Sequence, residues 1–322
     1  MSCDQDLSSL LTRQKEAFAS AGSVSADTRR QRLQQVIDLL VDNHAALTTA
    51  IDQDFGGRPA GFSLMNDVLG ALASLKYARD HLQEWMQDEP REMFSPYDQL
   101  GARAWVMHQP KGTVGILGTW NAPLYTLFSP LASALAAGNR AILKPSEVVP
   151  RTAALVARLC AEHLDPRVVA VVNGGPELGE AFSSQPFDHL VFTGSTAVGT
   201  RIAESCARSL KKTSLELGGK NPTLVFADSD WREHLDLLVR SAFQNSGQIC
   251  LCGSRMLVEQ SIHAEFRDAL VERVVALRVG DPIDEDNQLG PLVSQAHFDK
   301  VVVALARARD EGGQVRCGGA AL

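Results

Sequence analysis

The N-terminal part of the chain carries apolar residues at helical spacing. Residues 5–55 and 62–86 both show leucines and valines separated by charged residues, and this spacing predicts amphipathic helices. We expect Asp27 to cap one of these helices at its N-terminus. Residues 88–103 are polar and contain prolines, which predicts a linker, and a short strand is expected at Ala104–His108.

From Thr113 onward the pattern changes to short apolar runs separated by helical segments. The runs are TVGILGT, RAILKP, RVVAVVNG and DHLVFTG. The segments between and after them predict helices over 123–138, 150–163, 176–182 and 196–208. Alternating strands and helices predict an open twisted parallel sheet with helices on both faces, a Rossmann-like arrangement. Such a sheet binds ligands at the carboxyl ends of its strands.

A second α/β region begins after Leu215. It contains the expected strands TLVFAD and SRMLVE and helices near 231–247, 260–277 and 294–310. We therefore expect an α/β protein with two domains, residues 1–215 and residues 216–322. The second domain is expected to be incomplete, because the chain ends in GGAAL without a closing element.

Composition excludes several classes of protein. Of the 322 residues, 45% are hydrophobic and 21% are charged, which excludes intrinsic disorder as the main state. The net charge of -7 and the pI of about 5.6 argue against a nucleic-acid-binding surface. The longest apolar stretch, residues 124–138, is too short to span a bilayer, and the N-terminus has no secretory pattern. We expect a soluble cytoplasmic protein.

Six cysteines are too few for a disulfide scaffold in a chain of this length. Cys250 and Cys252 lack the further ligands that a zinc site needs, so we expect no metal. The segment FQNSGQICLCGSR (243–255) places both at the end of a predicted helix, in a loop rich in glycine and amide side chains. A thiol there can be activated as a nucleophile, whereas two small buried core residues would explain the same pattern.

Two further segments carry candidate catalytic groups. In LELGGKNP, Glu216 lies between leucines, and a carboxylate in apolar surroundings suits general-base chemistry; a solvated glutamate at a strand end is the alternative. In GTWNAP, Asn121 follows a strand, and its amide can donate to a developing oxyanion. The alternative for Asn121 is the N-cap of a helix that Pro123 begins.

The segments LKPSE and FTGSTAVG suit nucleotide binding. Lys144 can donate to ribose hydroxyls and Glu147 can accept from them, just after a predicted strand. Gly194 and Ser195 open a helix whose first amides can face a phosphate. As a glycine pattern alone this second segment is weak, because it is not the usual GxGxxG.

Taken together and in this order, the five segments resemble the signature segments of the aldehyde dehydrogenase superfamily, and the resemblance runs from about residue 10 to the last residue. It implies oxidation of an aldehyde to a carboxylic acid with NAD or NADP. Cys250, rather than Cys252, matches the nucleophile, Glu216 the general base and Asn121 the oxyanion donor. The cofactor-binding residues that it implies are Trp120, Lys144, Glu147, Gly194, Ser195, Gly199 and Gly218. NAD is expected over NADP, because Glu147 would repel a 2′-phosphate.

The pattern departs from the family in two ways. Members normally continue past this point with a Glu-x-Phe segment, the rest of the catalytic domain and a strand used in assembly. We therefore expect a C-terminally truncated chain with exposed apolar surface in its second domain, and a homo-oligomer, dimer or tetramer, for a full-length form. In addition, residues from about 100 to 200 resemble coniferyl aldehyde dehydrogenases, whereas residues from about 215 onward resemble muconic-semialdehyde dehydrogenases.

The expected substrate is an aromatic, medium aliphatic or semialdehyde compound. The residues expected along the aldehyde tunnel are mostly apolar: Trp120, Leu124, Phe243, Ile249 and Leu251. One alternative is a CoA-acylating semialdehyde dehydrogenase, which Glu216 disfavours because transfer to CoA needs no water-activating base. The other is a non-catalytic nucleotide-binding fragment, which has no use for Cys250, Glu216 and Asn121 together.

Overall fold

The structure is a computed structural model that describes residues 3–281 and 287–322. The chain divides into two compact units. The first comprises Met1–Leu47 and Leu64–Glu216, and the second comprises Thr48–Ser63 and Leu217–Leu322. The predicted domain division at residue 215 stays a prediction, and each unit is described by itself.

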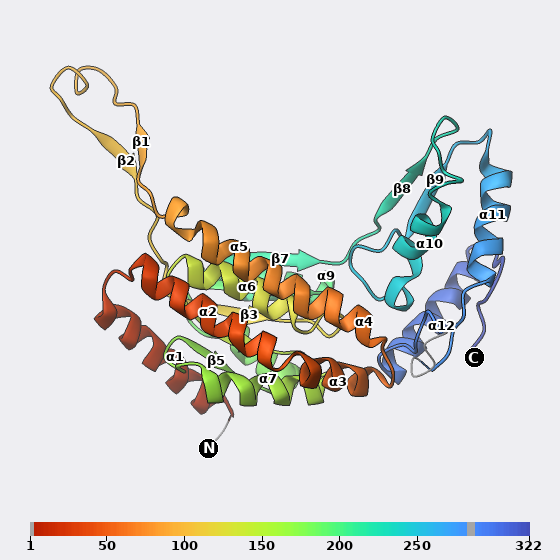
Figure 1. Cartoon of the computed structure of the whole chain (residues 1–322), viewed down its shortest axis with the longest axis horizontal. Helices are drawn as coiled ribbons and strands as arrows, with labels where there is room; N and C mark the ends of the chain where they lie inside the picture. Colours follow the sequence, from red (N-terminus) through yellow and green to blue (C-terminus); the bar gives the residue numbers. More distant parts are fainter. Residues whose placement is uncertain (1–2, 282–286) are drawn as a thin grey trace. The chain divides into compact units, whose positions relative to one another are not determined.

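The first unit is built around a five-stranded sheet (Figure 1). Its strands are β3 (Thr113–Leu117), β4 (Arg140–Lys144), β5 (Val169–Val171), β6 (His189–Gly194) and β7 (Lys212–Leu217). They lie in the order β5-β4-β3-β6-β7, and β3 pairs in parallel with both β4 and β6. Every residue of β3 and β4 is buried. Since successive side chains of a strand point to opposite faces, both faces of the sheet are covered there, which confirms the predicted parallel α/β fold.

Helices α6, α1 and α8 each pack against β3, and α2 and α5 pack against α6. The helices of this unit are α1 (Cys3–Ala21), α2 (Ala26–Asp42), α5 (Gly70–Trp85), α6 (Tyr125–Ala136), α7 (Pro150–His163), α8 (Pro176–Ser184) and α9 (Thr196–Ala207). The last four confirm the predicted helices to within about two residues at each end. Pro150 and Pro176 begin their helices because a first-turn residue needs no N–H partner.

The predicted cap of α2 is wrong. Ser25, in extended conformation, is the N-cap, and its Oγ accepts a hydrogen bond from the Thr28 N–H at 3.3 Å. Asp27 lies one residue inside the helix, where its carboxylate faces the positive end of the helix dipole and pairs with Arg30 at 2.8 Å. Both residues suit a helix start, and the backbone selects the earlier one.

Residues 62–86 do not form one regular α-helix. The short helix α4 (Ala60–Ser63) is followed by a π-helical stretch, η1 (Leu64–Leu69), and then by α5. The π-helical stretch contains Asp67, which is fully buried. Such stretches are rare and occur frequently at functional sites.

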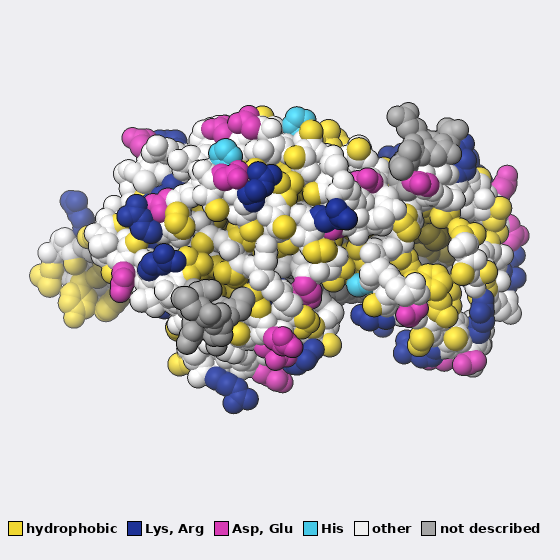
Figure 2. All heavy atoms as spheres, turned by 90° about the horizontal axis from the view of Figure 1, so that it is seen from below, with side chains coloured by type: hydrophobic (Ala, Val, Ile, Leu, Met, Phe, Trp, Pro, Cys, Tyr) yellow, Lys and Arg dark blue, Asp and Glu magenta, His cyan; other side chains and the backbone are white. Residues whose placement is uncertain are grey.

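A hairpin replaces the linker predicted over 88–103. Strand β1 (Glu89–Arg91) pairs antiparallel with β2 (Ala104–Val106), so the linker prediction is wrong at its start. Pro90 fits because a two-stranded ribbon has open edges that need no N–H donor. The hairpin lies at the left of Figure 2 and carries hydrophobic side chains there. The most exposed of these are Phe94, Leu100, Trp105 and Met107.

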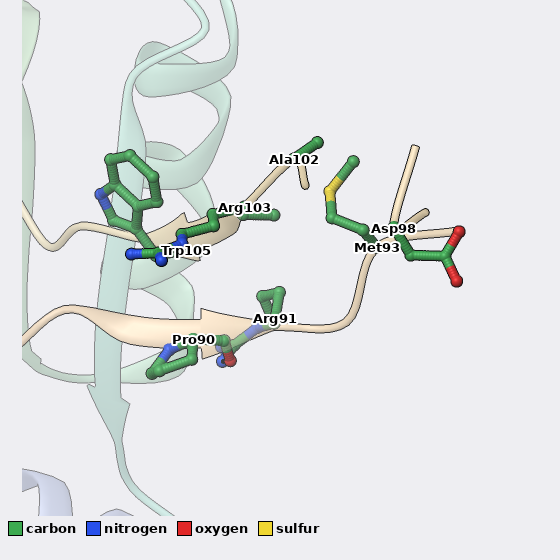
Figure 3. Close-up of a pocket in the computed structure, with 8 residues that line it drawn as sticks. Pro90, Arg91, Met93, Asp98, Ala102, Arg103 and Trp105 are labelled. Carbon is green, nitrogen blue, oxygen red and sulfur yellow. Dashed lines mark hydrogen bonds between the residues drawn. The ribbon is translucent and has the colours of Figure 1, made fainter. Parts of the chain in front are cut away.

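The hairpin also carries a shallow pocket (Figure 3). It is lined by Pro90, Arg91, Met93, Asp98, Ala102, Arg103, Ala104 and Trp105. None of the predicted site residues lines it, so it does not coincide with the predicted active site.

The second unit contains a parallel strand pair, β8 (Pro222–Val225) and β9 (Arg255–Val258). Its other elements are most of α3 (His44–Phe55), then α4, α10 (Leu235–Phe243), the 3-10 turn η2 (Gln244–Gly247), α11 (His263–Val275) and α12 (Gln295–Asp310). Trp231 and Phe266 meet edge to face, with ring centroids 5.2 Å apart, in a core with Val225 and Leu235. In contrast, Leu224, Phe226 and Leu257 are more than half exposed, in line with the apolar surface expected here. Among the described residues no helix is both long and apolar enough to cross a membrane.

Candidate active site

The predicted cofactor residues follow three adjacent strands. Trp120 lies shortly after β3, Lys144 is the last residue of β4 and Gly194 is the last residue of β6. The chain passes from β3 outward through β4 to β5 and then returns to β6 on the opposite side of β3. In open parallel sheets this reversal of strand order leaves a crevice at the carboxyl ends, which is where such folds bind nucleotides.

An ion pair between a buried lysine and an exposed glutamate lies at the end of β4. The Lys144 side chain is 5% exposed, and its Nζ donates to Glu147 Oε2 at 3.1 Å and to the Pro145 carbonyl at 3.2 Å. A buried ammonium needs such acceptors to offset its lost hydration. Glu147 is 41% exposed, so a donor and an acceptor lie side by side with the acceptor open to solvent. This pairing suits two neighbouring hydroxyl groups.

The turn after β6 forms the predicted start of α9. Ser195 is the N-cap, and its Oγ accepts from the Val198 N–H at 3.4 Å. A Cβ added to Gly194 would lie 2.5 Å from the Phe192 ring, which explains the glycine. Ser195 is exposed and Gly199 is buried, so the first turn of the helix is open while its next turn packs against the protein. An exposed helix N-terminus is a suitable anion site.

The segment GTWNAP is fixed at both ends. Helix α6 begins at Tyr125 with Leu124 as N-cap, so the interpretation of Asn121 as a helix cap is wrong. The Leu124 N–H donates to buried Asp67 Oδ1 at 3.1 Å, and the Thr119 N–H donates to Thr126 Oγ1 at 3.1 Å. Trp120 and Asn121, between these supports, are half-buried.

Glu216 is exposed near the end of β7. The strand alternates strictly, so Leu215 and Leu217 point to the opposite, partly buried face. The expectation of apolar surroundings for Glu216 is therefore wrong within this unit, because leucines next to a residue in a strand never share its face. Gly218 follows, and a Cβ added there would meet nothing within 4 Å.

The two cysteines of the second unit have opposite environments. Cys250 is exposed, whereas Cys252 is 7% exposed and its Sγ faces the Gln244 carbonyl at 3.9 Å. Burial, chiefly, raises the pKa of the Cys252 thiol, and the nearby Cys250 raises it further. The interpretation as buried core cysteines therefore applies to Cys252 alone.

The loop before Cys250 has an unusual backbone. Asn245 and Ser246 have φ of 53° and 57°, and Gly247 follows with φ of 74°. Consecutive left-handed residues are costly for residues other than glycine and persist where the surroundings impose them. Ser246 Oγ donates to the Gly290 carbonyl at 2.7 Å, which ties this part of the loop to a distant segment.

Sequence reasoning passed over two residues that support these loops. One is Asp67 beneath the Asn121 segment, and the other is Asn221, whose side chain contacts the backbone of the cysteine loop. The signal available for Asp67 was a carboxylate in an otherwise apolar helical stretch. The signal for Asn221 was an amide directly before Pro222, at the start of a strand.

Asn121 and Glu216 belong to the first unit and Cys250 to the second, so a site that uses all three is part of the proposal below. In the part of the chain that the structure describes, no group of three or more His, Cys, Asp or Glu side chains could bind a metal ion.

Comparison with known proteins identifies the family. The model of the aldehyde dehydrogenase family matches residues 3–322. A coniferyl aldehyde dehydrogenase from a Pseudomonas species is 38% identical over 312 residues, which cover 97% of this chain and 63% of the relative. Human 2-aminomuconic semialdehyde dehydrogenase is 38% identical over 311 residues, covering 94% of this chain and 62% of the relative. The solved structure of an indole-3-acetaldehyde dehydrogenase in complex with NAD+ has a TM-score of 0.91 and 28% identity, covering 99% of this chain and 64% of that one.

The parallel α/β sheet with this strand order, together with these matches, shows that the chain belongs to the aldehyde dehydrogenase family. The resemblance drawn from the five sequence segments is confirmed, and relatives of both expected kinds are found. The assignment of the two branches to different halves of the chain stays a prediction. The chain spans about 63% of the length of the curated coniferyl aldehyde dehydrogenases that it matches.

Proposed function

We propose that this protein is an NAD-dependent aldehyde dehydrogenase that oxidises an aldehyde to the carboxylic acid through a thioester on Cys250. One observation carries the proposal: Cys250 is an exposed thiol in a loop fixed by side chains, whereas the neighbouring Cys252 is buried. The similarity to a coniferyl aldehyde dehydrogenase and to 2-aminomuconic semialdehyde dehydrogenases supports an aromatic aldehyde or a semialdehyde as substrate.

In the first half-reaction the Cys250 thiolate attacks the aldehyde carbon, and the carbonyl oxygen becomes an alkoxide. The Asn121 amide and the Cys250 N–H donate to that oxygen, and one such donor contributes about 3–4 kcal/mol to the transition state. The alkoxide then re-forms the carbonyl, and the hydrogen on carbon leaves with its electron pair. The product bound to the enzyme is a thioester of Cys250.

In the second half-reaction Glu216 takes a proton from a water molecule, whose oxygen attacks the thioester carbon. The carbon–sulfur bond breaks, the carboxylic acid leaves and the Cys250 thiolate is restored. The exposure of Glu216 supports this role, because a general base for hydrolysis has to reach water.

NAD, when bound, supplies the acceptor for the hydride. The residues at the carboxyl ends of β4 and β6 fit this cofactor. Lys144 and Glu147 present a donor and an acceptor to a ribose, and the open first turn of α9 at Ser195 presents amides to a pyrophosphate. Glu147 favours NAD, since its exposed carboxylate would repel the 2′-phosphate of NADP. Trp120, Gly194, Gly199 and Gly218 complete the proposed cofactor-binding set.

We further propose that the full-length form is a cytoplasmic homo-oligomer. The cysteines described as free, Cys160, Cys206, Cys250, Cys252 and Cys317, suit a reducing compartment. The exposed apolar side chains of the hairpin suit burial against another subunit. Sedimentation equilibrium tests the assembly, and a monomer at micromolar concentration would contradict it.

A single-turnover assay tests the proposed activity. The purified chain is mixed with NAD and a panel of aromatic aldehydes and semialdehydes, and NADH absorbance is followed. We expect a burst near one equivalent per chain, followed by release of the acid whether or not CoA is present. NAD binding without a burst for any aldehyde would contradict the proposal, and an acyl-CoA product would replace hydrolysis with CoA acylation.

A further inference from the structure

One side-chain amide connects the cysteine loop to the strand pair of the second unit. Asn221 Nδ2 donates to the carbonyl oxygens of Cys250, at 2.5 Å, and of Cys252, at 3.0 Å. These residues lie 29 and 31 positions farther along the chain. A primary amide has two N–H donors, and the two bonds match that number.

The backbone of Asn221 is itself fixed. Its carbonyl accepts from the Arg255 N–H at 3.2 Å, and the next residue, Pro222, pairs with Arg255 in the register of β8 and β9. The Asn221 side chain is therefore anchored to a sheet, and through its two hydrogen bonds the position of the Cys250 backbone is set relative to that sheet.

These bonds also determine which way the peptide groups around Cys250 point. The Cys252 N–H donates to the Ile249 carbonyl at 3.1 Å, closing a turn. In a trans peptide the C=O and N–H bonds point in opposite directions, so the Cys250 N–H, which shares its peptide with the Ile249 carbonyl, points away from the turn. The Asn221 amide donates to the carbonyl of Cys250, which belongs to the following peptide, and to the carbonyl of Cys252 at the end of the turn. Both of these peptide groups are therefore fixed.

We propose that Asn221 is a positioning residue for the nucleophile: its amide fixes the Ile249–Cys252 turn so that the Cys250 thiol and N–H face the same reacting oxygen and carbon. This inference rests on the proposed function, because it takes Cys250 as the nucleophile. Gln248 gives the turn a second support, since its Oε1 accepts from the Val293 N–H at 3.0 Å. Asn221 is distinguished by contacting the nucleophile's own backbone.

The sharpest test replaces the amide with an isosteric carboxylate. Asn221→Asp keeps the shape of the side chain and places an oxygen against two carbonyl oxygens, which repel it. Asn221→Ser is a second variant, which keeps one donor and is milder. The matched control is Asn43→Asp, because the Asn43 amide also donates to a backbone carbonyl, that of Leu39 at 2.9 Å, in the first unit.

Two readouts are measured on the same full chain. The first is the rate constant of the NADH burst, with the aldehyde concentration at half-saturation and the NAD affinity measured alongside. We expect Asn221→Asp to slow the burst at least tenfold, Asn221→Ser to slow it less, and both to leave half-saturation and NAD affinity within about twofold. A purely structural defect would change the affinities as well, which separates positioning from loss of fold.

The second readout needs no dehydrogenase activity. Iodoacetamide labelling, resolved by tandem mass spectrometry, is expected to modify Cys250 and to leave Cys252 unmodified in the parent chain and in Asn43→Asp. In both Asn221 variants Cys252 should become labelled as well, because its carbonyl is released and its burial is lost. A parent chain without a burst would count against the proposed function, and the labelling alone would then decide the role of Asn221. Burst rates within twofold of the parent, or Cys252 unlabelled in both variants, would overturn the proposal.

Discussion

At the scale of single residues, the environments of two cysteines two positions apart separate their chemistry. Cys250 is exposed, and burial raises the pKa of the Cys252 thiol. Only the thiolate is a nucleophile, so the fraction of reactive Cys252 is small at neutral pH and increases only at a pH above the ordinary cysteine range. Cys252 is protected from reaction because it is buried under the loop. The residues on either side of it in the sequence do not reveal that burial.

The first prediction concerns the pH dependence of alkylation. Between pH 7 and 8.5 we expect Cys250 to react with iodoacetamide at least tenfold faster than Cys252, with the difference narrowing at higher pH as Cys252 ionises. In the tryptic peptide that contains both cysteines, residues 241–255, Cys250→Ala should remove the fast phase of labelling and Cys252→Ala should retain it. Loss of the fast phase in Cys252→Ala would show that Cys252, and not Cys250, is the reactive thiol.

The second prediction concerns Glu216. Glu216→Gln keeps the size of the side chain and removes the base, so hydride transfer should proceed while hydrolysis slows by about 10²- to 10⁴-fold. The expected result is a full NADH burst with little subsequent turnover, followed in a stopped-flow spectrophotometer. Full turnover in this variant would remove Glu216 as the general base, and Glu233→Gln, another exposed glutamate, serves as the control.

At the scale of elements, a π-helical stretch supports the segment that carries Asn121. Asp67 is fully buried in η1 and accepts the Leu124 N–H that precedes α6. This hydrogen bond joins a carboxylate in the π-helical stretch to a backbone amide 57 positions away in the chain. The segment is thus fixed by an element that is otherwise part of the helical layer over the sheet.

The third prediction follows from that contact. Asp67→Ala leaves the Leu124 N–H without this acceptor, and a buried donor deprived of its partner costs about 1–3 kcal/mol. We expect the free energy of unfolding in urea to fall by that amount. Asp80→Ala is the control, because Asp80 is exposed in its ion pair with Arg79 and an exposed ion pair contributes little to stability. Equal losses of unfolding free energy in the two variants would show that the Asp67 hydrogen bond contributes no more to stability than an exposed ion pair does.

Patterns within about ten residues predict most elements of this chain. The apolar runs predict β3, β4, β5 and β6, and helix-start residues such as Pro150 and Ser195 indicate where the following helices begin. Local competition explains the errors at α2, where Ser25 caps in place of Asp27, and at β1, where pairing with β2 turns a polar segment into a strand.

The residues that support the candidate site could not be predicted from such local patterns. Asp67 and Asn221 act on backbone groups 57 and 29 positions away, and no local periodicity encodes those partners. The exposure of Glu216 follows from strand alternation, which a reading of its two leucine neighbours alone overlooked. The family segments indicate which residues react, whereas tertiary contacts indicate what fixes them.

At the scale of the whole molecule, the proposed chemistry divides between the two units. The proposed cofactor contacts Lys144, Glu147 and Ser195 all belong to the first unit, and Cys250 belongs to the second. Cofactor binding and thiol reactivity are therefore expected to respond to different substitutions.

The fourth prediction uses this division. NAD at one hundred times its dissociation constant should stabilise the chain by about 2.7 kcal/mol, measured as a higher thermal midpoint. Lys144→Met keeps the buried aliphatic part of the side chain and removes the ammonium group, whose proposed hydrogen bonds to the cofactor are worth about 1.5–3 kcal/mol. NAD should therefore bind about 10- to 100-fold more weakly, while Cys250 alkylation stays unchanged. Lys76→Met, at an exposed lysine, is the control. An undiminished NAD shift in Lys144→Met would place the cofactor elsewhere.

The proposed chemistry requires Cys250 to carry the acyl group, and tandem mass spectrometry can locate that group. The Glu216→Gln chain is mixed with NAD and the aldehyde that gives the largest burst, quenched in acid and digested with trypsin. We expect the mass of one acyl group on Cys250 in the peptide that spans residues 241–255, with Cys252 unmodified. An acyl group on Cys252, or none on either cysteine while NADH has formed, would show that Cys250 is not the nucleophile.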